Sequence, residues 1–183
     1  GRGGIGGFLE QFPSLEEIRL FDAVPAACEA AASLYEGRAR FTVCGKPEEA
    51  VRGSDIVLTC SSSRKVLVQK EWIEKGMTII SINAFNDLDP GVTELADKWV
   101  LGVYREDAHS VLDNTDMSQG VQLDRERVYA DMPEIISGRR PGRTSEDEII
   151  LYSHMGMGAF DVACADIAYT RAKEKGIGTV LEV

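Results

Sequence analysis

Hydrophobic and polar residues follow one another along the chain in a pattern that predicts strands separated by helices. The predicted strands are alternating or wholly apolar runs bounded by polar residues or glycine, and they span 17–22, 41–44, 55–60, 77–82, 99–103 and 148–152. Helix-favouring composition, or proline at a first turn, predicts helices over 8–12, 25–35, 46–51, 70–74 and 132–136. Strands that alternate with helices over this length imply parallel βαβ units in a doubly wound sheet, which is a Rossmann-like α/β fold.

The end of the chain departs from this alternation. A turn-rich segment over 137–142 is followed by one more strand and then by a long, alanine-rich helix over 157–175. No further βαβ repeat is visible there. We therefore expect residues 1–142 to form a dinucleotide-binding domain and residues 143–183 to form a C-terminal tail that packs on another domain.

Composition narrows the classes of partner. The chain has 183 residues and a formal net charge of −10, so binding to a phosphate backbone is disfavoured as a main role. No apolar run approaches the ~20 residues that cross a bilayer, and no signal peptide opens the sequence. We expect a soluble, cytoplasmic protein that binds neither nucleic acid nor membrane. An anionic ligand would then depend on local devices, such as backbone N–H groups at the start of a helix.

Cysteine and histidine usage argues against a metal site. The four cysteines lie far apart without a CxxC pair, and the chain has only two histidines. Cys44 and Cys60 fall in apolar runs that predict buried strands. We expect free, buried thiols in a reducing compartment and no bound metal.

The sequence opens on a glycine-rich segment. Gly1, Gly3 and Gly6 fit the pattern G-x-G-x-x-G, and a helix-like segment follows. In a dinucleotide site such glycines permit a tight turn, close approach of the pyrophosphate and close packing of helix on strand. No strand precedes them, so we expect the first strand of the domain to be missing from a fragment or processed chain. A cloning remnant is the alternative.

Asp22 gives independent support for a nucleotide site. It ends a predicted strand about 20 residues beyond the glycines, where a carboxylate accepts hydrogen bonds from the adenosine ribose. Ala23 and Val24 offer no cation for a 2′-phosphate, which favours NAD over NADP. The alternative is an aspartate that caps the next helix.

Small hydroxylated residues stand at and directly after the end of the predicted strand over 55–60. Thr59, Ser61 and Ser62 stand where the carboxyl end of a parallel strand lines a cofactor cleft. A plain turn rich in serine is the competing interpretation.

Several segments of unrelated sequence resemble the ornithine cyclodeaminase and mu-crystallin family, in the family's order. They cover the chain from about Asp22 to its end and comprise 48–59 (EEAVRGSDIVLT), 61–64, 71–76, 82–84, 90–95, 141–149 (PGRTSEDEI) and 172–179 (AKEKGIGT). The resemblance implies a Rossmann domain paired with an N-terminal domain that binds an amino-acid substrate and forms a homodimer. The C-terminal tail of the family crosses back to that domain.

The resemblance also implies a cofactor and a reaction. In the cyclodeaminases, NAD accepts hydride from the α-carbon of the substrate, ammonia leaves, and reduction of the imine gives the cyclic product. The substrate-binding residues lie in the N-terminal domain, which this chain does not contain. We therefore expect the chain alone to bind NAD without turnover.

Individual site residues follow from the same resemblance. The family's general base is an aspartate whose ungapped position here is Leu88, between Asp87 and Asp89. We favour Asp87 over Asp89 as the base, with a structural Asp-Pro turn as the alternative.

The cofactor contacts implied near the nicotinamide are Asn83, Met155 and Gly156. His154 stands where the family tends to have serine, and a role for it in binding or in packing stays open.

Three functions remain after these steps. The first is hydride transfer at the α-carbon of an amino or imino acid. The second is an opine-type dehydrogenase or synthase that joins an amino acid to a keto acid. The third is a non-catalytic NAD(H)-binding protein with a storage or regulatory role, as mu-crystallin illustrates.

Overall fold

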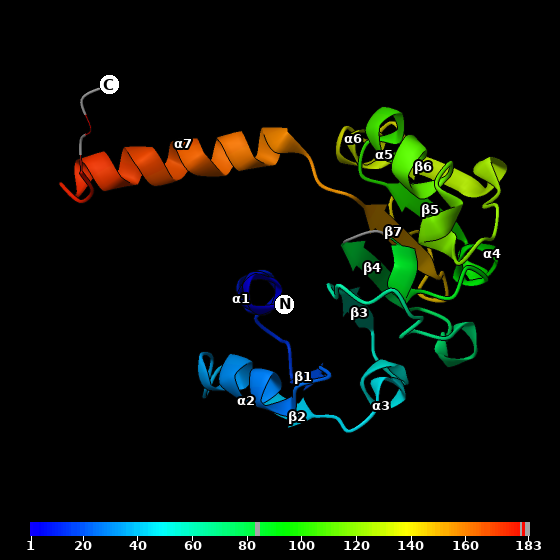
Figure 1. Ribbon diagram of the computed structural model, residues 1–183, viewed down its shortest axis with the longest axis horizontal. Coiled ribbons are helices and arrows are strands. Elements are labelled where there is room, and N and C mark those ends of the chain that lie inside the picture. Colours follow the sequence, from blue (N-terminus) through cyan, green and yellow to red (C-terminus); the bar gives the residue numbers. More distant parts are fainter. Residues whose placement is uncertain (83–84, 180, 182–183) are drawn as a thin grey trace.

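The computed structural model describes residues 1–82, 85–179 and 181 (Figure 1). The strands are β1 (Glu17–Leu20), β2 (Arg40–Val43), β3 (Ile56–Thr59), β4 (Thr78–Ile82), β5 (Lys98–Leu101), β6 (Val128–Asp131) and β7 (Ile150–His154). The α-helices are α1 (Arg2–Gln11), α2 (Pro25–Ser33), α3 (Pro47–Val51), α4 (Val92–Leu95), α5 (Tyr104–Val111), α6 (Met132–Ile136) and α7 (Gly158–Glu174). Single-turn 3₁₀ helices are η1 (Lys70–Trp72), η2 (Phe85–Asp87), η3 (Thr115–Ser118) and η4 (Arg125–Arg127).

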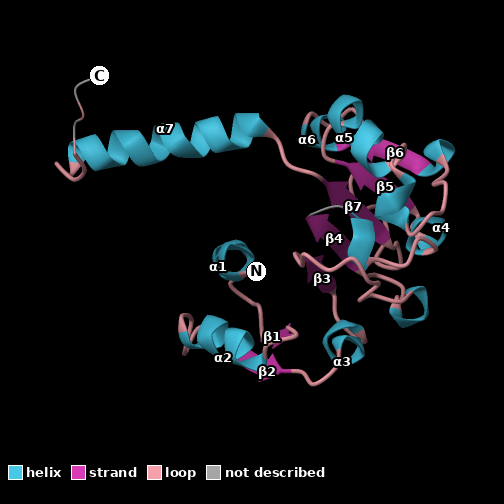
Figure 2. Cartoon of the chain, in the orientation of Figure 1, coloured by secondary structure: helices cyan, strands magenta, loops and turns pink. Residues whose placement is uncertain are grey.

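The strands form two sheets, and every strand pair is parallel. The larger sheet has the order β3-β4-β7-β5-β6, and β1 and β2 form a separate pair (Figure 2). Helices flank the strands, so the architecture is a Rossmann-like α/β fold, as the alternation of elements predicts. All four residues of β5 are buried, because this strand lies inside the sheet between β7 and β6.

Short sequence signals explain where the helices begin. α6 starts with a capping box, in which Asp131 accepts from the N–H of Glu134 at 3.1 Å and Glu134 accepts from the N–H of Asp131 at 3.2 Å. Pro133 occupies the first turn, where its missing N–H costs no hydrogen bond. α2 likewise has a proline, Pro25, in its first turn.

Two apolar clusters hold the chain together. The larger one lies around the five-stranded sheet and includes the fully buried Ile79, Trp99 and Leu151. Inside it the indole N–H of Trp99 donates to Ser153 Oγ at 3.0 Å, so the one polar atom of the ring is satisfied. The smaller cluster joins α1 and α2 to the β1–β2 pair.

An ion pair fixes the loop that enters β7. Lys98, at the start of β5, is 7 % exposed, and its Nζ donates to the carbonyl oxygen of Gly142 at 2.6 Å and to Thr144 Oγ1 at 3.0 Å. The same Nζ lies 2.8 Å from Glu148 Oε1. Hydrogen bonds from Lys98 and Thr144 lower the pKa of Glu148 to about 2.

The structure differs from the predicted pattern at several places. α1 begins at Arg2 rather than Phe8, the helix predicted over 70–74 is a single 3₁₀ turn, and β6 is an additional strand. β7 pairs with both β4 and β5, so the sheet takes in residues up to His154, beyond the expected domain end at residue 142. The position of the domain boundary itself stays a prediction.

Helix α7 leaves the five-stranded sheet after β7 and extends away from it (Figure 1). None of its residues is buried, and large apolar side chains such as Phe160, Val162 and Tyr169 are exposed. Within the described ranges, no helix has the length and apolar character needed to cross a membrane.

Candidate functional site

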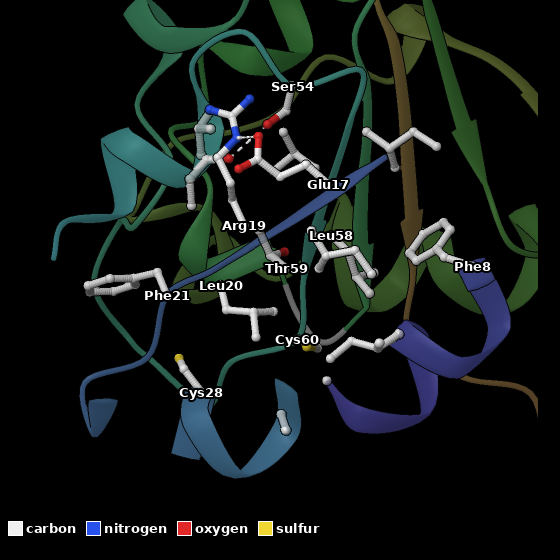
Figure 3. Close-up of a pocket in the computed structure, with 18 of the residues that line it drawn as sticks. Phe8, Glu17, Arg19, Leu20, Phe21, Cys28, Ser54, Leu58, Thr59 and Cys60 are labelled. Carbon is white, nitrogen blue, oxygen red and sulfur yellow. Dashed lines mark hydrogen bonds and ion pairs between the residues drawn. The ribbon is translucent and has the colours of Figure 1, made fainter. Parts of the chain in front are cut away.

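A groove of about 930 Å³ lies between β1 and β3 and is bordered at one end by the start of the chain (Figure 3). Both strands line it along their length, and Ile5 of α1 contributes to its wall. The residues after the two strands also line it, namely Phe21 and Asp22 after β1 and Cys60 and Ser61 after β3. The groove therefore includes a carboxyl edge of parallel strands, where α/β proteins bind ligands.

Four of the residues predicted for the cofactor site border this groove: Gly1, Asp22, Thr59 and Ser61. They come from three segments separated by more than 20 residues each, and the fold brings them to the same groove. Their roles in binding stay predictions. Ser62 is exposed and does not line the groove, and Asn83 lies outside the described residues.

Asp87 is a buried carboxylate linked to the end of β3. It is 1 % exposed, and its two oxygens accept hydrogen bonds from Thr59 Oγ1 at 3.1 Å and from Ser61 Oγ at 2.9 Å. Burial raises the pKa of Asp87, while the hydrogen bonds from Ser61 and Thr59 act in the opposite direction. The two hydrogen bonds fix the orientation of this carboxylate at the end of β3.

The two residues after Asp87, Leu88 and Asp89, have structural roles. Leu88 is fully buried in the large core, so the ungapped position of the family's base holds a packing residue. Asp89 Oδ1 accepts from the N–H of Gly91 at 2.7 Å, which is the local turn that the Asp-Pro sequence suggests. Of the two acids, Asp87 is the one that contacts the residues after β3.

Gly3 and Gly6 lie within α1, and Gly1 precedes the helix as its N-cap residue. A Cβ added to Gly1 would lie 3.6 Å from Cys60 Sγ, whereas one added to Gly6 would lie 2.8 Å from the hydroxyl oxygen of Tyr35. Gly3 has open space around it. Close packing of α1 on the rest of the chain therefore depends on Gly6, and Gly1 is the glycine that borders the groove.

Asp22 is exposed and is the second residue after the end of β1 at Leu20. Its Oδ1 accepts from the N–H of Val24 at 2.8 Å, a local turn before α2 begins at Pro25. The carboxylate thus takes part in the turn and also borders the groove. This geometry is compatible with a carboxylate that binds the ribose and with one that caps the next helix.

A second buried acid ties together the loops after β5 and β7. Asp107 is 1 % exposed and accepts from the N–H groups of Val103 at 2.9 Å and Met155 at 3.2 Å. Its Oδ2 also lies 3.3 Å from Nδ1 of His154. Asp107 was not singled out from the sequence, because an acid in a short helix gives no signal of a contact 48 residues away.

Asp107 therefore holds the segment that carries the predicted cofactor contacts Met155 and Gly156. Gly156 has a φ of +111°, in the region that favours glycine. Gly102 packs directly against the pair, since a Cβ there would lie 1.9 Å from His154 Nδ1.

The thiols differ from the prediction. Cys28 and Cys44 are buried, but Cys60 and Cys164 are exposed, so the prediction of buried thiols is wrong for Cys60 and Cys164. β3 ends at Thr59 and the groove leaves the following residue open. Burial raises the pKa of the Cys44 thiol. Among the residues that the structure describes, no cluster of histidine, cysteine, aspartate and glutamate could hold a metal ion.

A Rossmann-like sheet with small polar residues gathered at its carboxyl edge defines the class of nucleotide-binding α/β proteins. The comparison with known sequences makes the assignment more specific. The chain belongs to the ornithine cyclodeaminase/mu-crystallin family, whose sequence model matches residues 6–176.

Relatives of this chain include two amino-acid dehydrogenases. Alanine dehydrogenase of Archaeoglobus fulgidus is 31% identical over 178 residues, which are 95% of this chain and 54% of the relative. The N-((2S)-2-amino-2-carboxyethyl)-L-glutamate dehydrogenase of Staphylococcus aureus is 27% identical over 178 residues, covering 96% of this chain and 53% of the relative. This chain spans about half the length of these relatives.

A solved structure agrees with the fold. An archaeal alanine dehydrogenase dimer with bound NAD superposes with a TM-score of 0.81 at 29% identity, covering 97% of this chain and 56% of that chain.

Proposed function

We propose that this chain is the NAD-binding part of an enzyme that transfers hydride at the α-carbon of an amino or imino acid. The observation that carries the proposal is the convergence of Gly1, Asp22, Thr59 and Ser61 on one groove, in a family with amino-acid dehydrogenases among its members. The similar archaeal structure contains NAD.

The residues at the groove fit a dinucleotide. The exposed carboxylate of Asp22 can accept hydrogen bonds from ribose hydroxyls, and the N–H groups at the start of α1 can bind the pyrophosphate. The sequence after Asp22 has no cation for a 2′-phosphate, which favours NAD over NADP. Thr59, Ser61, Asn83, Met155 and Gly156 complete the proposed set of cofactor contacts.

Bound NAD would supply the hydride acceptor. The chain's own contribution is a positioned acid: Asp87 is the proposed base that removes a proton from the substrate's amino group. Thr59 and Ser61 fix both of its oxygens, and burial raises its pKa toward the range useful for proton transfer. Deamination with cyclisation is the specific reaction that the cyclodeaminase resemblance suggests.

A second candidate is an opine-type dehydrogenase that joins two amino-acid units. The relative from Staphylococcus aureus favours it, since the name of that enzyme describes a glutamate that carries an aminocarboxyethyl group. Product analysis of the full-length protein separates the two. Ornithine with NAD should yield a cyclic amino acid and ammonia in the first case, and an amine with a keto acid and NADH should yield a joined product and NAD in the second.

The exposed apolar residues of α7 support the expected domain arrangement. We infer that the tail packs on a substrate domain outside this chain, in a cytoplasmic homodimer. Burial of Phe160, Val162 and Tyr169 would remove apolar surface that water now contacts, which favours association.

Calorimetric titration of the chain with NAD and NADP tests the cofactor site. NAD should bind more tightly than NADP, and Asp22→Ala should weaken NAD binding by about tenfold, the effect of losing hydrogen bonds to a charged group. Asp166→Ala, which removes an exposed carboxylate on α7, is the matched control and should bind NAD as the parent chain does.

Absence of NAD binding to the chain would contradict the proposed site. Equal binding by the Asp22→Ala variant would remove Asp22 from it. Tight binding of NAD by the full-length protein without turnover of any amino acid would instead favour a storage or regulatory role.

A further inference from the structure

A buried aspartate and a histidine meet at the carboxyl end of β7, the middle strand of the five-stranded sheet (Figure 1). The side chains of His154 and Asp107 are 12% and 2% exposed, and Asp107 Oδ2 lies 3.3 Å from His154 Nδ1. Neither residue belongs to the cofactor contacts proposed above. Their position matters, because ligands of open α/β sheets bind at the carboxyl ends of the strands.

The histidine ring is held from several sides. It stacks on Tyr152 with the ring centroids 5.9 Å apart, and Phe160 contacts it edge-on with the centroids 6.1 Å apart. Gly102 leaves room for the ring, since a Cβ there would lie 1.9 Å from His154 Nδ1. A side chain that is already ordered in this way loses little rotamer freedom when a ligand binds.

Asp107 decides which nitrogen of the ring carries the hydrogen. A carboxylate only accepts hydrogen bonds, so the hydrogen is on Nδ1, the nitrogen beside it. The N–H groups of Val103 and Met155 donate to the same carboxylate and fix its orientation. In the neutral ring, Nε2 is then a hydrogen-bond acceptor. Among the residues that the structure describes, none forms a hydrogen bond with Nε2, and the ring is partly exposed.

His154 lies on the face of the sheet that carries α1. Buried and half-buried residues alternate along β7, which places Tyr152 and His154 together on one face. The strand pairings align Tyr152 with Leu58 of β3 through β4, and a Cβ on Gly4 of α1 would lie 2.7 Å from Leu58 Cδ2. β3 and β7 are two strand spacings apart, which is about 10 Å. A ligand that extends from the groove across the end of β4 would therefore reach His154.

The chemistry of the ligand determines what an acceptor at this position can bind. In the proposed function the ligand of the groove is NAD, whose nicotinamide carries a carboxamide with two N–H donors. The amino group of the substrate is the other N–H donor at the reacting end, and Asp87 is its proposed partner. The carboxamide is thus the donor for which the proposed site has named no acceptor side chain.

We propose that Nε2 of His154 accepts a hydrogen bond from the carboxamide of the nicotinamide, and that Asp107 is the positioning residue that keeps the ring in the required tautomer. The proposal rests on the proposed NAD site and adds a specificity-determining contact to it. The end of β7 then selects a pyridine ring that carries an N–H donor. Stacking on Tyr152 and the space left by Gly102 keep the imidazole in place for this contact.

The test compares NAD with acetylpyridine adenine dinucleotide, in which a methyl ketone replaces the carboxamide and removes its N–H donors. Calorimetric titration of the full-length protein gives the ratio of the two dissociation constants. The parent protein should bind NAD about fivefold more tightly than the analogue, which is the effect of one hydrogen bond. His154→Phe keeps an aromatic ring beside Tyr152 but has no acceptor, so its ratio should fall to about one.

Two further variants complete the comparison. His109→Phe is the matched control, because it removes the other histidine of the chain, whose side chain is 90% exposed, and it should keep the ratio of the parent protein. Asp107→Asn replaces one acceptor oxygen with an N–H donor and no longer fixes the tautomer, so its ratio should lie below that of the parent protein. Thermal unfolding shows whether each variant is folded, and His154→Phe decides the test if Asp107→Asn is not.

An unchanged ratio in His154→Phe would overturn the proposal. Equal binding of the two dinucleotides by the parent protein would also overturn it, and would leave the proposed NAD site intact. Failure of the parent protein to bind NAD at all would overturn both. If His154→Phe kept the ratio and raised the KM for the amino acid instead, Nε2 would bind the amino group of the substrate, and the assignment to the carboxamide would be wrong.

Discussion

The hydroxyl of Thr59 donates to Oδ1 of Asp87 at 3.1 Å, although the two residues are 28 positions apart in the sequence. The hydrogen bond joins the end of β3 to the turn that follows β4. Ser61 donates to the other oxygen of the same carboxylate. Asp87 is thereby oriented at the carboxyl edge of the sheet, where the proposed cofactor and substrate would meet.

Replacing Asp87 with asparagine should change how stability depends on pH. Burial raises the pKa of Asp87, so its contribution to stability is fully present below the unfolded value of 3.8 and is lost as pH rises through the folded value. Asparagine does not titrate. Asp87→Asn should therefore gain stability relative to the parent chain as pH rises, measured by urea unfolding from about pH 3 to about pH 8.

Thr93→Ser is a suitable control, since it alters a buried polar residue without removing a titrating group. A difference between Asp87→Asn and the parent chain that stays constant over the pH series would contradict the prediction. In the full-length enzyme, the same Asp87→Asn change should lower turnover by about a hundredfold or more if Asp87 is the base.

Glu148 should give the opposite pH dependence. Its pKa is lowered to about 2 by the hydrogen bonds from Lys98 and Thr144, so it contributes stability above the unfolded value of 4.5. That contribution is lost as pH falls toward about 2. Glu148→Gln should flatten the acid limb of the stability curve in this window, whereas Glu146→Gln, an exposed neighbour, should leave it unchanged.

Lys98 should contribute more to the free energy of unfolding than the surface residue Lys75. Lys98→Ala removes one partner of a nearly buried ion pair and should lower the free energy of unfolding by about 3 kcal/mol. Lys75 pairs with Asp147 at the surface, with side chains 77% and 73% exposed, and Lys75→Ala should cost less than about 1 kcal/mol. If urea titrations gave similar losses in the free energy of unfolding for the two variants, the ion pair of Lys98 with Glu148 would not be what holds the loop before β7.

Gly102 should tolerate no side chain. A Cβ there would lie 1.9 Å from His154 Nδ1 and 2.5 Å from Asp107 Oδ2, so Gly102→Ala must displace this pair. We expect a loss of about 1–3 kcal/mol from overpacking. Gly7→Ala lies in α1 with open space around it and should raise stability by about 0.5–1 kcal/mol. A neutral Gly102→Ala in thermal unfolding would show that the His154–Asp107 contact can shift freely.

The six strands predicted from the sequence are all present, because apolar runs and alternation report directly on burial in a sheet. β6 was not predicted, because its apolar run over 128–130 is short and leads directly into the capping box of α6. α1 extends over the glycines because Ile5 and Leu9 pack on β1 and α2, a tertiary contact that outweighs the low helix propensity of glycine.

The candidate site was predictable only in part. Asp22, Thr59 and Ser61 could be found because each follows an apolar run, which is where parallel strands end. The contacts of Asp87 with Thr59 and Ser61 could not, since they depend on the turn after β4 folding back onto β3. Asp107 carried no signal, because its partners Val103 and Met155 offer only backbone N–H groups and the side chain of His154 lies 47 positions away in the sequence.

The sequence by itself determined the α/β class, the parallel strands and the membership of a family, because these depend on local periodicity and on motifs in order. The tertiary structure alone decided the strand order, with β7 inserted between β4 and β5, and the gap between β1 and β3. Strand order depends on which apolar faces meet after long connections, and no local pattern records that choice. The same long-range packing buries Asp87 and Asp107 and gives each of them hydrogen-bond partners that are distant in the sequence.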